Sequence, residues 1–449
     1  MDNPLLILAG HAASWHRCPW PDGLEHHARR ALLDWFAATL PGAQRPPATL
    51  LAAALADERG VGQAVCYVDG QRGLARHAAL LNAIASHTVE FDDIHRDSGL
   101  HPGSPTIAAA LAVAQGQGAS MDQLLRALVA GYEVGGRIAL AVQPSHYRMW
   151  HTTATVGTIS AAVAAALLLG CDAVRIGHAI ALAATSAGGL QQAFRGEGLS
   201  KPMHAGHAAE AGLLAARAAA AGVTGAPDVL HGPAGFAAAT SDSTGQWDHA
   251  LIGLGESFVI ASITFKNHGC CGHIFPALDG LLALREQHGF EPDDVLSIHV
   301  AGYRPTAEMC DRPVVTTEQE ARFSTQYCIA ALLHLGAVRL DAFTPQRLQD
   351  PILHAFMPKV SVSLAPDLAD AYPRRRAARL RVELKSGEVL LHEQPIRKGD
   401  PEMPLTDTEL TDKFRELVSP VLGKAGAGTL LECILTGKDV PADAGASPD

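Results

Sequence analysis

The stretch EFDDIHRDSGLHPGS, residues 90–104, could move a proton or hold a metal ion, although the chain around it is mostly alanine, leucine and glycine. Its four acids and two histidines are Glu90, Asp92, Asp93, His95, Asp97 and His101. A helix through the first part would place Glu90, Asp93 and Asp97 on one side. Gly99 would end that helix and leave His101 in a loop. A metal site, a proton-transfer site and a solvated helix end are the three interpretations.

We favour proton transfer, in which the carboxylates orient the histidines and fix their tautomers. A metal site would need both histidines and carboxylates around one ion, but His95 and His101 straddle the expected helix end and show no recognised ligand spacing. The stretch HGCCGH, residues 268–273, is also a weak zinc signal, because zinc ligands are usually further apart and no second pair follows. We therefore expect no metal.

Four expected helix beginnings combine a basic side chain with a helix N-terminus. The basic residues are His101 before Ser104-Pro105, His151 before Thr152-Thr153, Lys201 with His204 around Pro202, and His268 with His273 before Pro276. Free N–H groups and the helix dipole favour anions at such places. If several of them converge in space, they form a pocket for a small polycarboxylate.

Lys201 lies in the glycine-rich segment GGLQQAFRGEGLSKPMH, which we expect to be a loop. The ordinary interpretation is a surface cation. A lysine that is partly desolvated near other cations would instead have a lowered pKa and could act as a base. His151 is equally open between a core histidine and a catalytic one. His204 and His207 are either part of the same site or residues on a helix surface.

The elements that must position these residues are mostly helices. From about residue 24 to 262, apolar residues recur at helical spacing in Ala-rich segments separated by glycine and proline, which is typical of a large helical bundle. The expected helices span 28–40, 48–58, 74–93, 105–116, 120–142, 153–169, 172–187 and 202–221.

The pattern changes near residue 290. Residues 295–300, 359–364 and 379–384 alternate apolar and polar side chains, and a hairpin follows at 385–392. A helix at 321–336 lies between these strands, and residues 405–422 are helical again. We predict a mainly α protein, with a large all-helical domain of residues 1–262 completed by 398–449, and a smaller α+β lid domain of residues 263–397.

Composition excludes several classes of partner. The net charge of −11 argues against a nucleic-acid groove, which needs a basic face. No uninterrupted apolar run is long enough to span a membrane, and Asp2 stands where a signal peptide would carry positive charge. The 8 cysteines form no disulfide framework. We expect a cytoplasmic protein with reduced thiols that binds neither nucleic acid nor membrane.

Taken together, these stretches resemble the MmgE/PrpD family, which includes 2-methylcitrate dehydratases, cis-aconitate decarboxylase and iminodisuccinate epimerase. The resemblance covers most of the chain. The matching stretches are VEFDDIH with HPGSPTIAAALA, GYEVGGRIA, HTTATVGTISAAVAAALLLG, SKPMHAGHAAEAG, CCGHIFPALD and ARFSTQYCIAALL.

The resemblance implies a large helical domain, a smaller α+β lid with the active site between them, a homodimer, and no metal or organic cofactor. The family's acidic position falls on Glu90 or Asp93, and its loop histidine falls on His101. Its second histidine and its lysine fall on His151 and Lys201, and His204 lies beside the lysine.

One position departs from the family's pattern. The family usually has a histidine where this chain has Phe275, in CGHIFPALD. His273 and His268 precede it and are the candidates to replace that histidine. If neither does, a lid-side acid is missing and the substrate differs from methylcitrate, or the protein only binds its ligand.

The chemistry implied is attack on a C–H or C–C bond beside a carboxylate of a small di- or tricarboxylate. Lys201 or His151 would be the base, His101 and His273 would act as acids or bind the anion, and Glu90 and Asp93 would orient them. The residues expected to contact the substrate are His204, His268, Arg137, Arg148 and Arg195. We expect a 2-methylcitrate dehydratase-like hydro-lyase first, with a decarboxylase, an epimerase, a metal-dependent hydrolase or a non-catalytic binding protein as alternatives.

Overall fold

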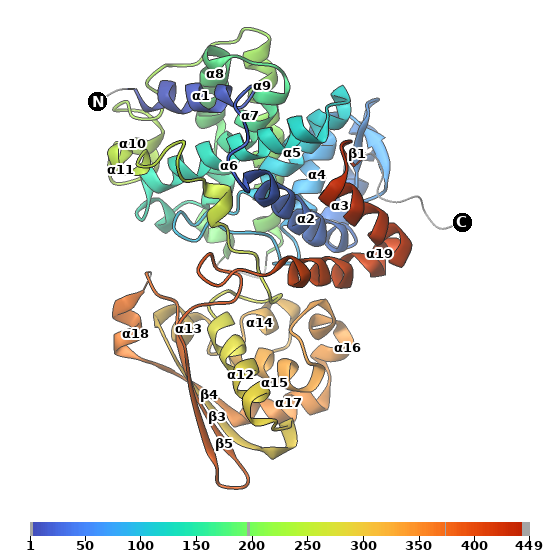
Figure 1. Ribbon diagram of the computed structural model, residues 1–449, viewed down its shortest axis with the longest axis vertical. Helices are drawn as coiled ribbons and strands as arrows, with labels where there is room; N and C mark the ends of the chain where they lie inside the picture. The colour runs from blue at the N-terminus through green and yellow to red at the C-terminus, as the bar shows by residue number, and fades with distance from the viewer. Residues whose placement is uncertain (1–2, 195–197, 373, 442–449) are drawn as a thin grey trace. The chain divides into compact units, whose positions relative to one another are not determined.

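The computed structural model describes residues 3–194, 198–372 and 374–441. The chain separates into two compact units, which we call the helical unit, Met1–Thr264 with Thr406–Asp449, and the mixed unit, Phe265–Leu405 (Figure 1). The boundaries fall at 264/265 and 405/406, whereas the sequence suggested 262/263 and 397/398. The fold is mainly α.

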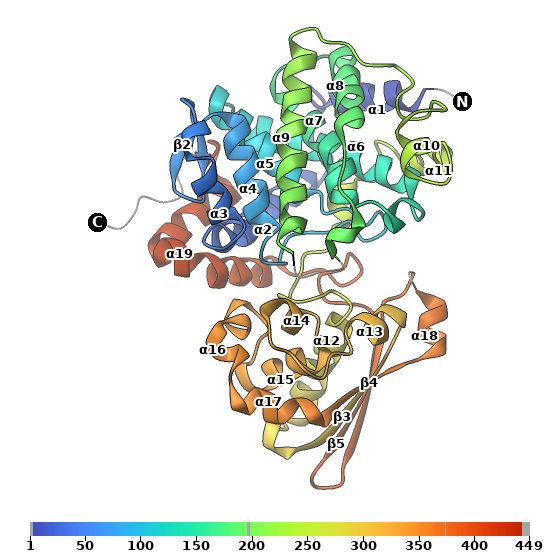
Figure 2. The same ribbon diagram turned by 180° about the vertical axis from the view of Figure 1, so that it is seen from behind.

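The helical unit is a bundle around α7. Its helices are α1 Pro4–Ser14, α2 Leu24–Gly42, α3 Ala48–Ala54, α4 Ala75–Ser86, α5 Gly103–Gln117, α6 Met121–Val142, α7 Thr152–Leu168, α8 Ala173–Ser186, α9 Ser200–Ala220, α10 Phe236–Thr240, α11 Trp247–Ala250 and α19 Asp407–Thr436, with 3-10 turns at Ala56–Glu58, His146–Arg148, Gln191–Phe194 and Val259–Ser262. Helix α7 packs against α5, α6, α8 and α9 (Figure 2). Small residues allow this, because a Cβ on Gly212 of α9 would collide with the Thr158 carbonyl.

The helical unit is not all-helical, so that expectation is wrong. Strands β1 Ala64–Cys66 and β2 Gln71–Gly73 form a short antiparallel hairpin, in which Val65 pairs with Arg72. Gly70 supplies the left-handed conformation that the turn needs, with φ of 69°. Strands of three residues carry too little alternation to be recognised in a sequence.

The helix expected at 74–93 is shorter than its pattern suggests. Helix α4 ends at Ser86, and residues 87–102 are a loop. The shared helical face of Glu90, Asp93 and Asp97 therefore does not exist, and Gly99, with φ of 63°, lies in a turn and does not end a helix. The carboxylates in this loop bond to imidazoles and to the start of α5, and these tertiary bonds compensate for the lost helical ones.

Three helices begin one or two residues earlier than the sequence suggested. Helix α5 starts at Gly103, so Ser104 lies in its first turn and is not its N-cap. Thr152 is likewise the first residue of α7, and His151 holds the N-cap position without a side-chain capping bond. The sequence suggested that Lys201 lies in a loop. It lies instead in the first turn of α9.

Helix α19 returns to the helical unit, as the sequence predicted, and packs on α2. A buried ion pair joins them, with Lys413 Nζ 2.6 Å from Asp34 Oδ1. By length and composition α19 is the one described helix that could cross a membrane. Gly423, with φ of 68° and ψ of 165°, interrupts it, so neither helical half reaches the roughly 20 residues that a bilayer requires.

The mixed unit is a four-stranded sheet with helices. Its strands are β3 Val295–Gly302, β4 Val360–Leu364, β5 Ala378–Leu384 and β6 Val389–Gln394, in the order β4-β3-β5-β6, with β3 parallel to β4 and the other pairs antiparallel. Its helices are α12 Phe275–His288, α13 Arg304–Met309, α14 Glu318–Arg322, α15 Thr325–Leu335, α16 Pro345–Leu348, α17 Pro351–Phe356 and α18 Pro366–Ala371, with 3-10 turns at Pro292–Asp294, Leu340–Phe343 and Met357–Lys359. The expected strands and hairpin are all present.

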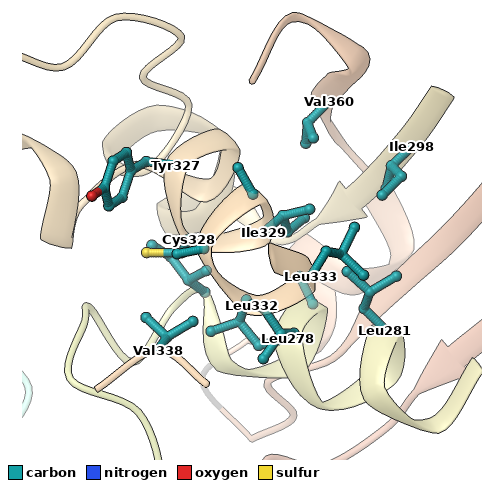
Figure 3. Close-up of a cluster of buried hydrophobic side chains, with 14 of the residues drawn as sticks. Leu278, Leu281, Ile298, Tyr327, Cys328, Ile329, Leu332, Leu333, Val338 and Val360 are labelled. Atoms are coloured by element: carbon teal, nitrogen blue, oxygen red, sulfur yellow. The ribbon is translucent and has the colours of Figure 1, made fainter. Parts of the chain in front are cut away.

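The core of the mixed unit lies between α12, α15 and the sheet. Figure 3 shows Leu278 and Leu281 of α12 beside Leu332 and Leu333 of α15, and these side chains are buried. The helix expected at 321–336 is divided, because Ser324 caps a new helix by accepting the Tyr327 N–H at 3.0 Å.

Candidate active site

Glu90 occupies a strained position in the loop between α4 and α5. It is the one non-glycine residue with a positive φ, 59°, among the described residues. Such a conformation costs about 1–3 kcal/mol and is concentrated at functional sites. The Glu90 carboxylate pairs with Lys201 Nζ of α9, and the two side chains are 15% and 16% exposed. An acid and a base are thus held together at a partly open position.

Asp92, in the same loop, lies against two imidazoles. His87 Nδ1 donates to Asp92 Oδ2 at 2.6 Å, and His101 Nδ1 lies 3.0 Å from the same oxygen. The Ser104 hydroxyl donates to that oxygen at 3.1 Å. Because a carboxylate oxygen only accepts, His87 carries a proton on Nδ1. His101 Nδ1 lies at ion-pair distance from the same oxygen but outside hydrogen-bond geometry.

Two more histidines extend this group. The His151 ring stacks on His87 with centroids 5.5 Å apart, and its Nδ1 lies 3.0 Å from His204 Nδ1. Burial, reinforced by the charges of His87 and Lys201, lowers the pKa of His151 well below its usual value. Burial and the neighbouring His87 lower the pKa of His204 to about 4. Both rings are therefore neutral at pH 7, and one donates to the other.

The beginnings of three helices converge on this cluster. His101 precedes α5, His151 caps α7, and Lys201 stands in the first turn of α9. The His101 N–H donates to Thr153 Oγ1 of α7 at 3.1 Å. The structure thus brings together three of the four basic helix beginnings noted in the sequence. Their N–H groups and dipoles add to the positive charge of Lys201 and favour an anion.

Asp93 anchors the loop that carries Glu90 and Asp92. Its Oδ1 accepts the Gly103 N–H at 3.0 Å and its Oδ2 accepts the Tyr132 hydroxyl at 2.7 Å, which ties the loop to α5 and α6. Burial and the nearby Asp34 carboxylate raise the pKa of Asp93 to about 8. Asp93 is thus protonated at neutral pH, and its hydrogen bonds fix the position of the loop without adding a negative charge to the site.

His273, His268 and Phe275 lie in the mixed unit. His273 Nδ1 is 2.8 Å from the Tyr303 hydroxyl, and burial with two nearby arginines lowers the pKa of His273 to about 3. This histidine is neutral at pH 7. His268 Nε2 is 3.0 Å from Asp279 Oδ1, and its ring packs edge-on against buried Phe275. Phe275 occupies the position of the family histidine. That His273 or His268 takes over the role of that histidine stays a prediction.

The arginines expected to bind carboxylates lie elsewhere. Arg137 is buried, and its guanidinium donates to Glu133 and to the carbonyls of Ala250 and Ser257, so it holds the 250–257 loop in place. Arg148 is exposed and pairs with Asp242. Neither is brought to the histidine cluster. Arg195 lies outside the described residues.

The metal interpretation can be tested on distances. The ligand atoms of His87, Asp92 and His101 lie within 4.8 Å of one another. Tetrahedral zinc would hold such N and O atoms about 3.3 Å apart, whereas the two Nδ1 atoms lie 2.6 and 3.0 Å from one oxygen. That spacing fits shared protons better than an ion. His95 does not join them, because its Nδ1 is bonded to Ser98 at 2.8 Å.

His87 and Asp92 are the residues that sequence reasoning missed. Asp92 was counted among the carboxylates expected to orient the histidines but was not named as a site residue, and His87 was assigned no role. Both are buried. The one available signal was a histidine inside an apolar stretch, five residues before an Asp-Asp pair.

Comparison with known proteins gives consistent matches over most of the chain. A family model described as the MmgE/PrpD N-terminal domain matches residues 7–247, and one described as the MmgE/PrpD C-terminal domain matches residues 268–435. The cis-aconitate decarboxylase-like protein oryM of Aspergillus oryzae is 28% identical over 430 residues, which cover 90% of this chain and 88% of that protein.

Two further relatives carry a related name. The cis-aconitate decarboxylase of Homo sapiens is 25% identical over 374 residues, covering 81% of this chain and 77% of the relative. The cis-aconitate decarboxylase of Aspergillus terreus is 25% identical over 446 residues, covering 92% of this chain and 89% of the relative.

Proposed function

This chain belongs to the MmgE/PrpD family, and on that basis we propose that it is a cofactor-independent decarboxylase of a small unsaturated tricarboxylate of the cis-aconitate type. The observation that carries the proposal is the Lys201–Glu90 ion pair beside four histidines at three converging helix beginnings. The names of the relatives favour decarboxylation over the dehydration that was expected first from the sequence.

The reaction sets three requirements. One C–C bond to a carboxylate breaks, and CO₂ leaves without the bonding electron pair. That pair is delocalised over the adjacent double bond and a remaining carboxylate, so cations and N–H donors must face it. One proton is then added to a carbon, so that a trianion and a proton give a dianion and CO₂. The site must therefore supply positive charge and a proton donor, but no oxidant or reductant.

The cluster offers a residue for each requirement. Lys201, which forms an ion pair with Glu90, and the three helix N-termini would bind the substrate's carboxylates. His101, beside the Asp92 carboxylate, would hold the proton to be delivered, because a neighbouring anion favours the imidazolium. Of the neutral pair His151 and His204, the ring that accepts the Nδ1–H of the other carries its own proton on Nε2 and would donate it to the developing negative charge.

This assignment changes the role first given to Lys201. Lys201 Nζ is already paired with the Glu90 carboxylate, an arrangement in which the side chain acts as a cation. Lys201 is therefore better suited to bind a carboxylate than to remove a proton. The proposal retains from the family resemblance a mixed unit that acts as a lid and the absence of a metal, and both stay predictions.

A panel of di- and tricarboxylates, including cis-aconitate, 2-methylcitrate and an iminodisuccinate analogue, tests the proposal. The purified protein is incubated with each compound in deuterated water, while CO₂ is trapped and the products are followed by proton NMR. We expect CO₂ release from the unsaturated tricarboxylate, with deuterium at one product carbon. Loss of water from 2-methylcitrate without CO₂ would restore the dehydratase, and exchange of deuterium alone would favour the epimerase. Metal analysis and chelator treatment of the same protein distinguish these three activities from a metal-dependent hydrolase, which would contain a metal ion and lose activity with a chelator.

A further inference from the structure

We propose that His87 and Asp92 are positioning residues, which fix the orientation of the His101 ring and reserve its Nε2 for proton transfer. The inference deepens the proposed function and rests on it for the role of His101 as proton donor. Neither His87 nor Asp92 needs to touch the substrate, because each acts through another side chain.

The first argument is the crowding at Asp92 Oδ2. This buried oxygen lies 2.6 Å from His87 Nδ1, 3.0 Å from His101 Nδ1 and 3.1 Å from Ser104 Oγ. A buried carboxylate is strongly unfavourable unless its oxygens are satisfied. The hydrogen bonds from His87 and Ser104 satisfy this oxygen and draw on its negative charge, while His101 Nδ1 lies at ion-pair distance from it. His101 therefore receives a share of that charge, and the share depends on His87.

The second argument is the placement of the His87 ring. His87 is completely buried, packs edge-on against His101 with centroids 5.1 Å apart, and stacks on His151 at 5.5 Å. Its second nitrogen, Nε2, is buried and has no hydrogen-bond partner in the described parts of the chain. Such a nitrogen costs free energy that an apolar ring would avoid. The Nδ1 bond to Asp92 supplies a reason for a histidine here.

The charge on His101 is set by all the ionisable groups gathered here. They are His87 at the end of α4, Glu90, Asp92 and Asp93 in the loop, His151 at the start of α7, and Lys201 with His204 in α9. Asp92 Oδ2 lies 3.0 Å from His101 Nδ1, and a carboxylate at that distance favours the imidazolium. Removing the His87 donor leaves more of the Asp92 charge to His101.

The experiment follows the titration of His101 by NMR of the imidazole nitrogens in the substrate-free full-length protein. His87→Leu should raise the His101 midpoint by at least about half a pH unit, and Asp92→Asn should lower it. Ser104→Ala removes a weaker donor from the same oxygen and should raise the midpoint less than His87→Leu. Asp92→Asn keeps the shape of the side chain, so it tests the same contacts if the leucine variant is poorly folded.

A His101 midpoint within about 0.2 units of wild type in both His87→Leu and Asp92→Asn would overturn the inference. The NMR readout needs no substrate, so it stands even if the protein does not decarboxylate cis-aconitate. Where it does, the alkaline limb of the kcat/KM pH profile, which reports loss of the His101 proton, should move with the midpoint, while KM changes little. A loss of kcat at all pH values without a shift of that limb would show a merely structural role and contradict the inference.

Discussion

The contact between Lys201 and Glu90 decides which chemistry the site can perform. Glu90 is held in a left-handed conformation, which aims its carboxylate at the first turn of α9. An ammonium fixed in this way can bind a substrate carboxylate more tightly, because the lysine side chain is already ordered and loses little conformational entropy on binding. The strain at Glu90 is thus best explained by pre-organisation of the cation.

The sequence identified much of the site because its residues occur in short local motifs. Glu90, His101, His151 and Lys201 could be named from such motifs, and the structure places them in one cluster. The contacts that set their protonation could not be named, because the His87–Asp92 bond depends on where a helix ends. Arg137 was wrongly expected to contact the substrate. Its guanidinium donates to Glu133 and to the Ala250 carbonyl, and no local sequence pattern shows these contacts.

Asp93 yields a prediction about pH. The unfolded chain loses this proton near the ordinary carboxyl pKa, whereas the folded protein holds it to about pH 8. Folding must therefore take up a proton between these values, which costs up to about 1.4 kcal/mol per pH unit. Asp93→Asn cannot titrate, so its Tm relative to wild type should rise from pH 5 to 8 and then level off.

The matched control is Asp97→Asn, in the same loop but exposed. Its Tm should stay parallel to that of wild type over the same pH range. Parallel curves for Asp93→Asn and wild type would show that Asp93 is ionised in the folded protein.

At the scale of elements, the start of α5 is fitted tightly around Asp93. A Cβ on Gly103 would lie 2.7 Å from Asp93 Oδ1 and 2.8 Å from the Tyr132 hydroxyl oxygen. Gly103→Ala should therefore cost about 1–3 kcal/mol and lower the Tm by at least about 2 °C. It should also reduce turnover, since it displaces the loop that carries Glu90 and Asp92.

Gly116, in the same helix, is the control for that substitution, because nothing lies within 4 Å of its added Cβ. Gly116→Ala should be neutral or stabilise by up to about 1 kcal/mol. If the two alanine variants melt alike, the close fit at Gly103 is not real.

A buried ion pair between Lys413 and Asp34 is among the contacts that join α19 to α2. Lys413→Met would remove a buried charge from this pair, which should cost about 3–5 kcal/mol in chemical unfolding. Arg415→Met, two residues away, removes an exposed ion pair with Asp412 at 3.7 Å and should change stability by less than about 1 kcal/mol. Equal effects of the two changes would contradict the importance of the buried pair.

Helical periodicity located most elements because it reports which face is buried. It failed at 87–102, where apolar and acidic residues continue a helical spacing but their side chains bond to other elements. The hairpin β1–β2 was not predicted, because its strands are too short to show an alternating pattern. Both errors arise where tertiary hydrogen bonds override local preference.

At the scale of the whole molecule, we predict a homodimer. Several apolar side chains on α8, α9 and the turn after α9, including Val174, Leu214 and Val223, are about half exposed or more. Light scattering at micromolar concentration should give about twice the 47.0 kDa chain mass. An apolar contact should persist at 1 M salt, which screens ion pairs. A mass near one chain at either salt concentration would contradict this prediction.

The central claim is that the Lys201 cluster decarboxylates a cis-aconitate-type acid, and one NMR time course in deuterated water tests it most directly. Wild type, Lys201→Met and Lys201→Arg are compared on cis-aconitate. We predict CO₂ and a singly deuterated unsaturated dicarboxylate from wild type, and a loss of at least about a hundredfold in Lys201→Met. Lys201→Arg keeps a permanent charge and should retain more of the rate than the methionine variant. Equal failure of both variants would return Lys201 to the role of base, and a Lys201→Met variant that releases CO₂ at the wild-type rate would contradict the account.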